Sequence, residues 1–206
     1  MTHRLLTRSS LTIAVLAGGL LPSAGPELPA KAAPVVSDPV ALSALPDDIE
    51  AMVVWALDLF DEAEMELPPL VINHHGEDTE PCNGRIGLHR TTAARSVVEL
   101  CTDDVGFPTQ AMILHELAHA WVDHNVDEER RLAFQELRGY EYWHDYDEAR
   151  WHENGTEQAA EIIAWGLFDR PMAMLRIHQN SCDELEAGYR TLTETAPLHG
   201  FRDKCG

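Results

Sequence analysis

The sequence predicts an α+β fold, in which a small antiparallel or mixed sheet packs on one central helix and a mainly helical C-terminal half follows. Residues 109–124 repeat apolar side chains at helical spacing, and two short runs of β-forming residues, 85–89 and 96–100, precede them. A second apolar helix begins near residue 155. The 206 residues suffice for one sizeable hydrophobic core and not for two.

Residues 1–24 predict a secretory signal peptide. Basic residues come first, the apolar run Leu11–Leu21 follows, and small residues lead to Ala24. We expect cleavage after Ala24 or as late as residue 32, and hence a secreted protein. The alternative is a retained membrane anchor, but the run has about half the length needed to cross a bilayer. We therefore expect no stable membrane span once the signal is removed.

The domain is expected to span residues 46–206, after a flexible lead-in, 25–45, that is rich in proline and alanine. Asp47 or Asp48 is expected to cap the first helix, which ends before a pair of prolines. One apolar stripe marks this helix: Ile49, Met52, Val53, Ala56, Leu57 and Phe60. Leu70–Asn73 then predicts a short strand.

Four cysteines in an exported chain imply two disulfides. Cys82 and Cys101 bracket the two β-forming runs, which would pair antiparallel and bring these cysteines together. Cys182 and Cys205 would then close a C-terminal loop of about two dozen residues. A cysteine metal site is not expected, because no two cysteines have the two-to-four-residue spacing of zinc knuckles.

The net charge of −20 argues against a nucleic-acid partner. Such acidity first indicates solubility, and only secondarily a preference for cationic substrates through electrostatic steering. We expect the exported domain to be a monomer.

The most informative motif is His115-Glu116-Leu117-Ala118-His119, within the apolar stretch 109–124. Histidines at positions i and i+4 of a helix lie one turn apart on one face, so both rings can reach a single ion. Glu116 lies on the flank of that face, from which it can take a proton from metal-bound water. Because burying ionisable groups without partners is costly, the apolar context favours a metal site.

A catalytic zinc site needs a third protein ligand and an open position for water. Glu157 is the preferred candidate, on the helix that begins near residue 155. Glu161 projects from the same face one turn later; it could accept a hydrogen bond from His115 or His119, or be the ligand instead. A cation beside the two carboxylates would reverse their mutual repulsion. His124 points away from the histidine face and is not expected to bind metal.

The two motifs together resemble those of the gluzincin clan of zinc metallopeptidases. The matched residues are His115, Glu116, His119, Glu157, Ala160 and Glu161. The resemblance implies a zincin-like fold with one Zn²⁺ held by both histidines and Glu157, with Glu116 as the base and Glu161 orienting a ligand. It also implies a peptide or protein substrate that adds to an edge strand beside the cleft, either Ser96–Leu100 or Arg85–His89.

The C-terminal half is predicted to contain a helix from Asp127 to about Arg138, stopped by Gly139, and a helix with a capping box at Ser181 and Glu184. Between them, the aromatic and charged segment 140–154 is too polar for core. It could form a cleft wall and supply an oxyanion donor, and three candidates stay open: Tyr146, His144 and His152.

The sequence thus favours a secreted zinc-dependent peptidase. The alternative is an exported binding or structural module of zincin fold, with a vestigial metal site or one closed by a fourth protein ligand such as His152 or Glu161. A zinc hydrolase that acts on a non-peptide amide would use the same three ligands.

Overall fold

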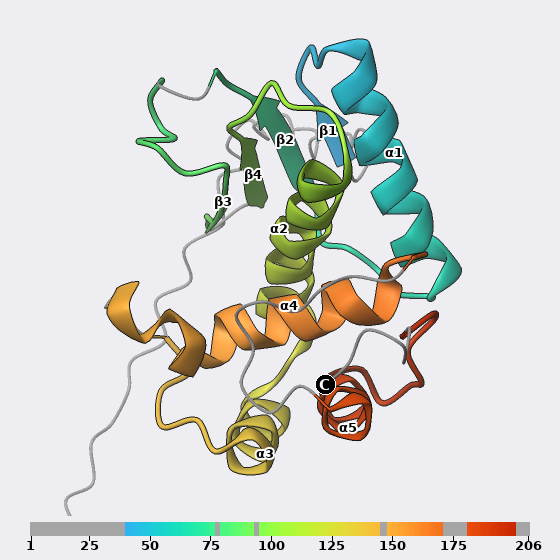
Figure 1. Cartoon of the computed structure of the whole chain (residues 1–206), viewed down its shortest axis with the longest axis vertical. Helices are drawn as coiled ribbons and strands as arrows, with labels where there is room; N and C mark the ends of the chain where they lie inside the picture. Colours follow the sequence, from blue (N-terminus) through green and yellow to red (C-terminus); the bar gives the residue numbers. More distant parts are fainter. Residues whose placement is uncertain (1–39, 77–78, 93–94, 145–147, 171–180, 201–206) are drawn as a thin grey trace, which may run out of the picture. The chain divides into compact units, whose positions relative to one another are not determined.

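The computed structural model describes residues 40–76, 79–92, 95–144, 148–170 and 181–200. The elements in chain order are β1 (Val40–Leu42), α1 (Asp47–Glu62), β2 (Leu70–His74), β3 (Gly87–Thr91), β4 (Ser96–Leu100), α2 (Phe107–Asn125), α3 (Glu128–Arg138), the 3-10 helix η1 (Glu148–Glu153), α4 (Gly155–Leu167) and α5 (Cys182–Thr193) (Figure 1). The α+β prediction is confirmed, with the sheet packed on α2 and a mainly helical half after it.

The four strands form one mixed sheet in the order β1-β2-β4-β3. β1 and β4 each pair parallel with β2, whereas β3 pairs antiparallel with β4, as the two cysteine-bracketed runs predicted. β3 is therefore an edge strand and β4 is internal. Of the two candidate substrate strands, only the one predicted at 85–89, which the structure places at Gly87–Thr91, lies at an edge.

Residues Val40–Leu42 form β1, although the sequence places them in the flexible lead-in. Their pairing with Leu70–Ile72 supplies backbone hydrogen bonds that a three-residue run cannot reveal locally. The predicted signal peptide and the rest of the lead-in lie outside the described residues.

Side chains from one face of the sheet join those of α1 and α2 in the hydrophobic core. Ile72 of β2 and Val98 of β4 are fully buried there. On β3, Gly87 lies opposite Leu100 and His89 lies opposite Val98, so both share this inner face. β3 thereby directs its inner side chains toward α2.

The disulfide prediction is confirmed for Cys82 and Cys101, whose Cα atoms lie 5.7 Å apart. The bridge ties the loop before β3 to the end of β4. Cys182 is also disulfide-bonded, but its predicted partner Cys205 lies outside the described residues.

The predicted cap of the first helix by Asp47 or Asp48 is wrong: Pro46 occupies the N-cap position without a side-chain hydrogen bond, and both aspartates lie in the first turn of α1, where their negative charge favours the helix N-terminus. The predicted ends of α3 and α5 agree with the structure. The Asp127 side chain accepts a hydrogen bond from the Arg130 backbone N–H, and Gly139 ends α3 with a left-handed φ of 73°. The capping box of Ser181 and Glu184 opens α5. Within the described part of the chain, no helix combines the length and apolar character needed to cross a membrane.

Candidate metal centre

Two helices build the centre, and they cross near the middle of α2 (Figure 1). α2 is buried on most sides, and its apolar residues Leu114, Leu117 and Ala118 have no exposed surface. On α4, Ala160 and Ala164 share the face of Glu157 and are fully buried. Such small side chains permit a close approach of the two helices.

The start of α4 is fixed by the segment before it. The Gly155 N–H donates to the Tyr142 carbonyl at 2.9 Å and the Thr156 N–H donates to the Trp143 carbonyl at 2.8 Å. A Cβ on Gly155 would lie 3.0 Å from that Tyr142 oxygen, so this close approach leaves little room for a side chain. The first turn of α4, with Glu157, is thereby held in place.

The structure brings His115, His119 and Glu157 together. The Nε2 atoms of the two histidines are 3.1 Å apart, and Glu157 Oε2 lies 3.1 Å from His115 Nε2 and 3.3 Å from His119 Nε2. A tetrahedral zinc ion with ligands at 2.0–2.1 Å places neighbouring ligand atoms about 3.3–3.4 Å apart. The three atoms already stand close to that spacing, so the donor set and its geometry both fit one zinc ion.

Glu161 occupies a different position from Glu157. Its Oε2 lies 2.9 Å from Nδ1 of His115, on the side of the ring away from the three clustered atoms. In this arrangement Nδ1–H donates to Glu161 and leaves Nε2 free to face a metal ion. The geometry therefore separates the two glutamates: Glu157, which the sequence preferred as the third ligand, lies with the two Nε2 atoms, and Glu161, the alternative, contacts Nδ1 of His115.

The ionisable groups of the centre depend strongly on one another. Burial favours the neutral ring of His115, but hydrogen bonds with Glu157 and Glu161 overcome this and raise its pKa well above the ordinary value. Burial likewise opposes the charge of Glu157, yet hydrogen bonds with His115 and His119 lower its pKa. The charges of these side chains are thus mutually paired.

Glu116 lies on the flank of α2 that faces β3. It is only 8% exposed, and burial raises its pKa against the opposing effect of the two neighbouring histidines. A Cβ on Gly87 of β3 would lie 2.7 Å from Oε1 of Glu116 and 2.6 Å from Sδ of Met112. The absence of a side chain at Gly87 is what lets the strand lie against the Glu116 carboxylate.

Each histidine of the motif also contacts a flat ring from another element. The His115 and His119 rings are perpendicular, with centroids 4.7 Å apart. His89 of β3 stacks parallel to His119 at 6.0 Å, and Trp151 of η1 stacks on His115 at 6.2 Å. The sequence pointed to Trp151 only as part of the possible cleft wall 140–154, and it did not point to Gly87 or His89, because no local pattern links these residues to the motif.

The His89 side chain is 7% exposed, and its Nδ1 lies 3.9 Å from Oδ2 of Asp123. Burial, helped by the nearby His119, lowers the pKa of His89 to about 4, while Asp123 acts in the opposite direction. The ring is therefore neutral at physiological pH.

The candidate oxyanion donors lie in differing surroundings. Tyr146 is outside the described residues, His144 is exposed, and His152 Nε2 lies 3.5 Å from the Glu153 carboxylate. The segment 140–154 is not uniformly too polar for core, because Tyr140 is 8% exposed and its hydroxyl donates to Gln158 of α4. The aromatic body of a tyrosine is buried readily once its hydroxyl has a partner.

Comparison of the chain with protein-family models, curated protein sequences and solved structures gives no significant match. Assignment of the site therefore rests on its own geometry. Two imidazoles and one carboxylate, presented by two crossing helices, form a zincin-like site that could hold one metal ion.

Proposed function

We propose that the protein is a secreted zinc-dependent peptidase of gluzincin type, with one Zn²⁺ held by His115, His119 and Glu157. The observation that carries the proposal is the 3.1–3.3 Å spacing of the three ligand atoms. Bound there, zinc would polarise the scissile carbonyl and acidify a water molecule. The chain's own residues would bind the substrate, orient the ligands and move the proton.

Glu116 is the proposed general base. It follows a ligand histidine directly, so its carboxylate lies beside the metal position without belonging to the ligand set. Burial raises its pKa toward the range in which a carboxylate accepts and returns a proton effectively. Glu161 would hold His115 in the tautomer that presents Nε2 to the metal.

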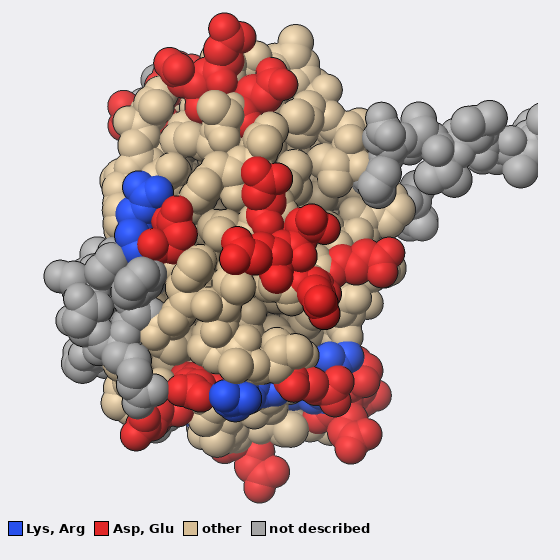
Figure 2. All heavy atoms as spheres, turned by 90° about the vertical axis from the view of Figure 1, so that its right-hand side faces the viewer, with Lys and Arg blue, Asp and Glu red and all other residues tan. Residues whose placement is uncertain are grey.

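The proposed substrate is a peptide or protein bound in extended form along β3. This edge strand lies next to Glu116 at Gly87, and an edge strand offers unpaired backbone groups for strand addition. Acidic side chains predominate over basic ones on the face that carries α1 (Figure 2). We attribute this charge mainly to solubility, with steering of cationic substrates as a secondary effect.

Secretion is part of the proposal, since the predicted signal peptide and the Cys82–Cys101 disulfide both accord with an oxidising compartment. We also propose that the mature domain acts as a monomer without a nucleic-acid partner. A binding module with a closed metal site is less well supported, because the described cluster of donor atoms contains three residues and neither His152 nor Glu161 belongs to it. The side chains of His115 and Glu157 are 13% and 24% exposed, which leaves the site open to water.

The test measures two quantities for the wild type and three variants: the zinc content, and the digestion of an unbiased peptide library. Glu116→Gln should retain stoichiometric zinc and lose hydrolysis by about 10²- to 10⁴-fold, whereas Glu157→Ala should lose zinc. The matched control is Glu153→Gln, a nearby carboxylate whose side chain is 54% exposed. Wild-type activity in Glu116→Gln, or full zinc occupancy in Glu157→Ala, would overturn the proposal. Zinc binding without peptide cleavage would favour the non-peptide amide hydrolase.

A further inference from the structure

Two further flat rings flank the two histidines at the proposed zinc position. His115 and His119 stand perpendicular at 87°, and each has a near-parallel ring on one face. The interplanar angle is 4° between His89 and His119 and 23° between Trp151 and His115. Because ring nitrogens bind a metal in the plane of the ring, stacking on a face leaves the metal-binding lone pairs unobstructed.

The two outer rings come from different elements of the fold. His89 belongs to β3, where register with β4 fixes its position opposite Val98. Trp151 belongs to η1, directly before α4. Each ligand histidine is thus contacted by an element other than its own helix, which limits rotation about its side-chain bonds.

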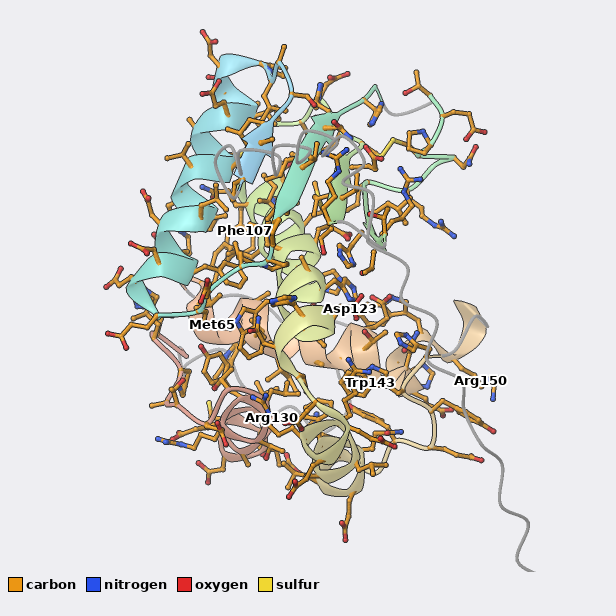
Figure 3. The ribbon with its side chains drawn as sticks, turned by 180° about the vertical axis from the view of Figure 1, so that it is seen from behind. Met65, Phe107, Asp123, Arg130, Trp143 and Arg150 are labelled. Carbon is orange, nitrogen blue, oxygen red and sulfur yellow. A yellow bond between two sulfur atoms is a disulfide. The ribbon has the colours of Figure 1, made fainter. Side chains whose placement is uncertain are left out.

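His89 lies beside Asp123 but beyond hydrogen-bond distance from it. Its Nδ1 lies 3.9 Å from the carboxylate of Asp123, and Thr91 Oγ1 donates to the same carboxylate at 2.8 Å. Asp123 follows His119 by one helical turn and lies on the flank of α2, as Figure 3 shows. Nε2 of His89 is buried and has no hydrogen-bond partner among the described residues. The contact of this ring that bears on the proposed site is therefore its parallel arrangement with the ring of His119, with 6.0 Å between the centroids.

We propose that His89 and Trp151 are positioning residues, which hold the imidazoles of His119 and His115 in the perpendicular arrangement that zinc requires. The inference rests on the proposed function, since it assumes that these histidines bind metal. Neither residue is a ligand; His89 is not part of the described cluster of donor atoms. Their contribution is to reduce the number of ring orientations that zinc binding would otherwise have to restrict.

The test is zinc affinity by competition with a chromophoric chelator, together with the visible spectrum of the Co²⁺-substituted protein. His89→Ala and Trp151→Ala should each bind zinc about tenfold more weakly, within the range known for groups that orient metal ligands. Because the two rings contact different histidines, the double variant should lose about a hundredfold. His89→Phe and Trp151→Phe keep a flat ring and should restore near-wild-type affinity and Co²⁺ spectrum.

The matched control is His124→Ala, which removes an exposed imidazole from α2, the helix that carries His115 and His119. If an alanine variant does not fold, His89→Leu or Trp151→Leu replaces it, because leucine fills space without a flat face. Wild-type affinity in the alanine or leucine variants, or failure of phenylalanine to restore it, overturns the inference. A wild-type protein that binds zinc but cleaves no peptide refutes the peptidase alone, whereas one that binds no zinc refutes both.

Discussion

Substitution of Gly87 by alanine offers a sharp test of how β3 and α2 fit together. The added Cβ would lie 2.6 Å from Sδ of Met112, 2.7 Å from Oε1 of Glu116 and 2.9 Å from its Cγ. Ordinary contacts between such atoms are about 3.5–4.0 Å, so the overlap is close to 1 Å. Gly87 has no positive φ, so alanine causes no backbone strain and its effect is purely steric.

The overlap is relieved most easily by moving the ends of the Glu116 and Met112 side chains. We therefore expect the fold to persist at a cost of about 1–3 kcal/mol in the free energy of unfolding, as for other overpacked sites. At about 2–4 °C per kcal/mol for a domain of this size, Tm should fall by roughly 2–12 °C. Displacement of the Glu116 carboxylate by about 1 Å should lower kcat by about a hundredfold.

The assay is kcat on a library-derived peptide, with zinc content and thermal unfolding measured on the same protein. Zinc should stay stoichiometric, because the added Cβ would come nearest to Met112 and Glu116, and neither is one of the three ligand residues. Gly76→Ala is the control, since among the described residues an added Cβ there would come nearest to Thr79 Cγ2, at 3.9 Å, which is an ordinary contact. Equal kcat in Gly87→Ala and wild type, or an equal loss in both variants, would refute the proposed contact between β3 and the base.

Three further predictions concern stability. Removal of zinc with a chelator should cost about 2.7 kcal/mol relative to protein in zinc at a hundred times Kd; an unchanged Tm would contradict metal binding. The paired change of Cys82 and Cys101 to alanine should cost about 3 kcal/mol in urea unfolding, because the bridge closes a loop with a sequence separation of 19; an unchanged urea midpoint would count against it. Glu99 is 3% exposed; burial would raise its pKa, but hydrogen bonds with His75 and other side chains lower it. The Glu99 carboxylate thus stabilises the fold above the ordinary carboxyl pKa of about 4.3, and this stabilisation is lost as the pH falls through the lower pKa of the folded state. Glu99→Gln should therefore weaken the loss of stability at acid pH, measured by urea unfolding. A steeper loss in that variant would be the opposite of this expectation.

The features predicted best from sequence are those decided within one or two helical turns. The Asp127 cap, the Gly139 stop and the Ser181 capping box each depend on hydrogen bonds or backbone angles among near neighbours. The spacing of His115 and His119 belongs to the same class, because the helical period alone puts both rings on one face.

Other features could not be read locally. β1 forms from three residues without a distinctive pattern, because β2 supplies its hydrogen bonds. The position of β3 at the edge follows from the strand order and not from its composition. Contacts of Gly87 and His89 with α2 join residues about 30 positions apart, and no periodicity in the chain encodes them.

The sequence by itself determined the side chains that this protein offers: two histidines and a glutamate on one buried helix, and two carboxylates one turn apart on another. Only the tertiary structure decided how these groups are used. The crossing of α2 and α4 puts Glu157 against both Nε2 atoms and Glu161 against the outer nitrogen of His115. Helical periodicity fixes which side chains share a face, but the angle and depth of packing between two helices decide which of them meet.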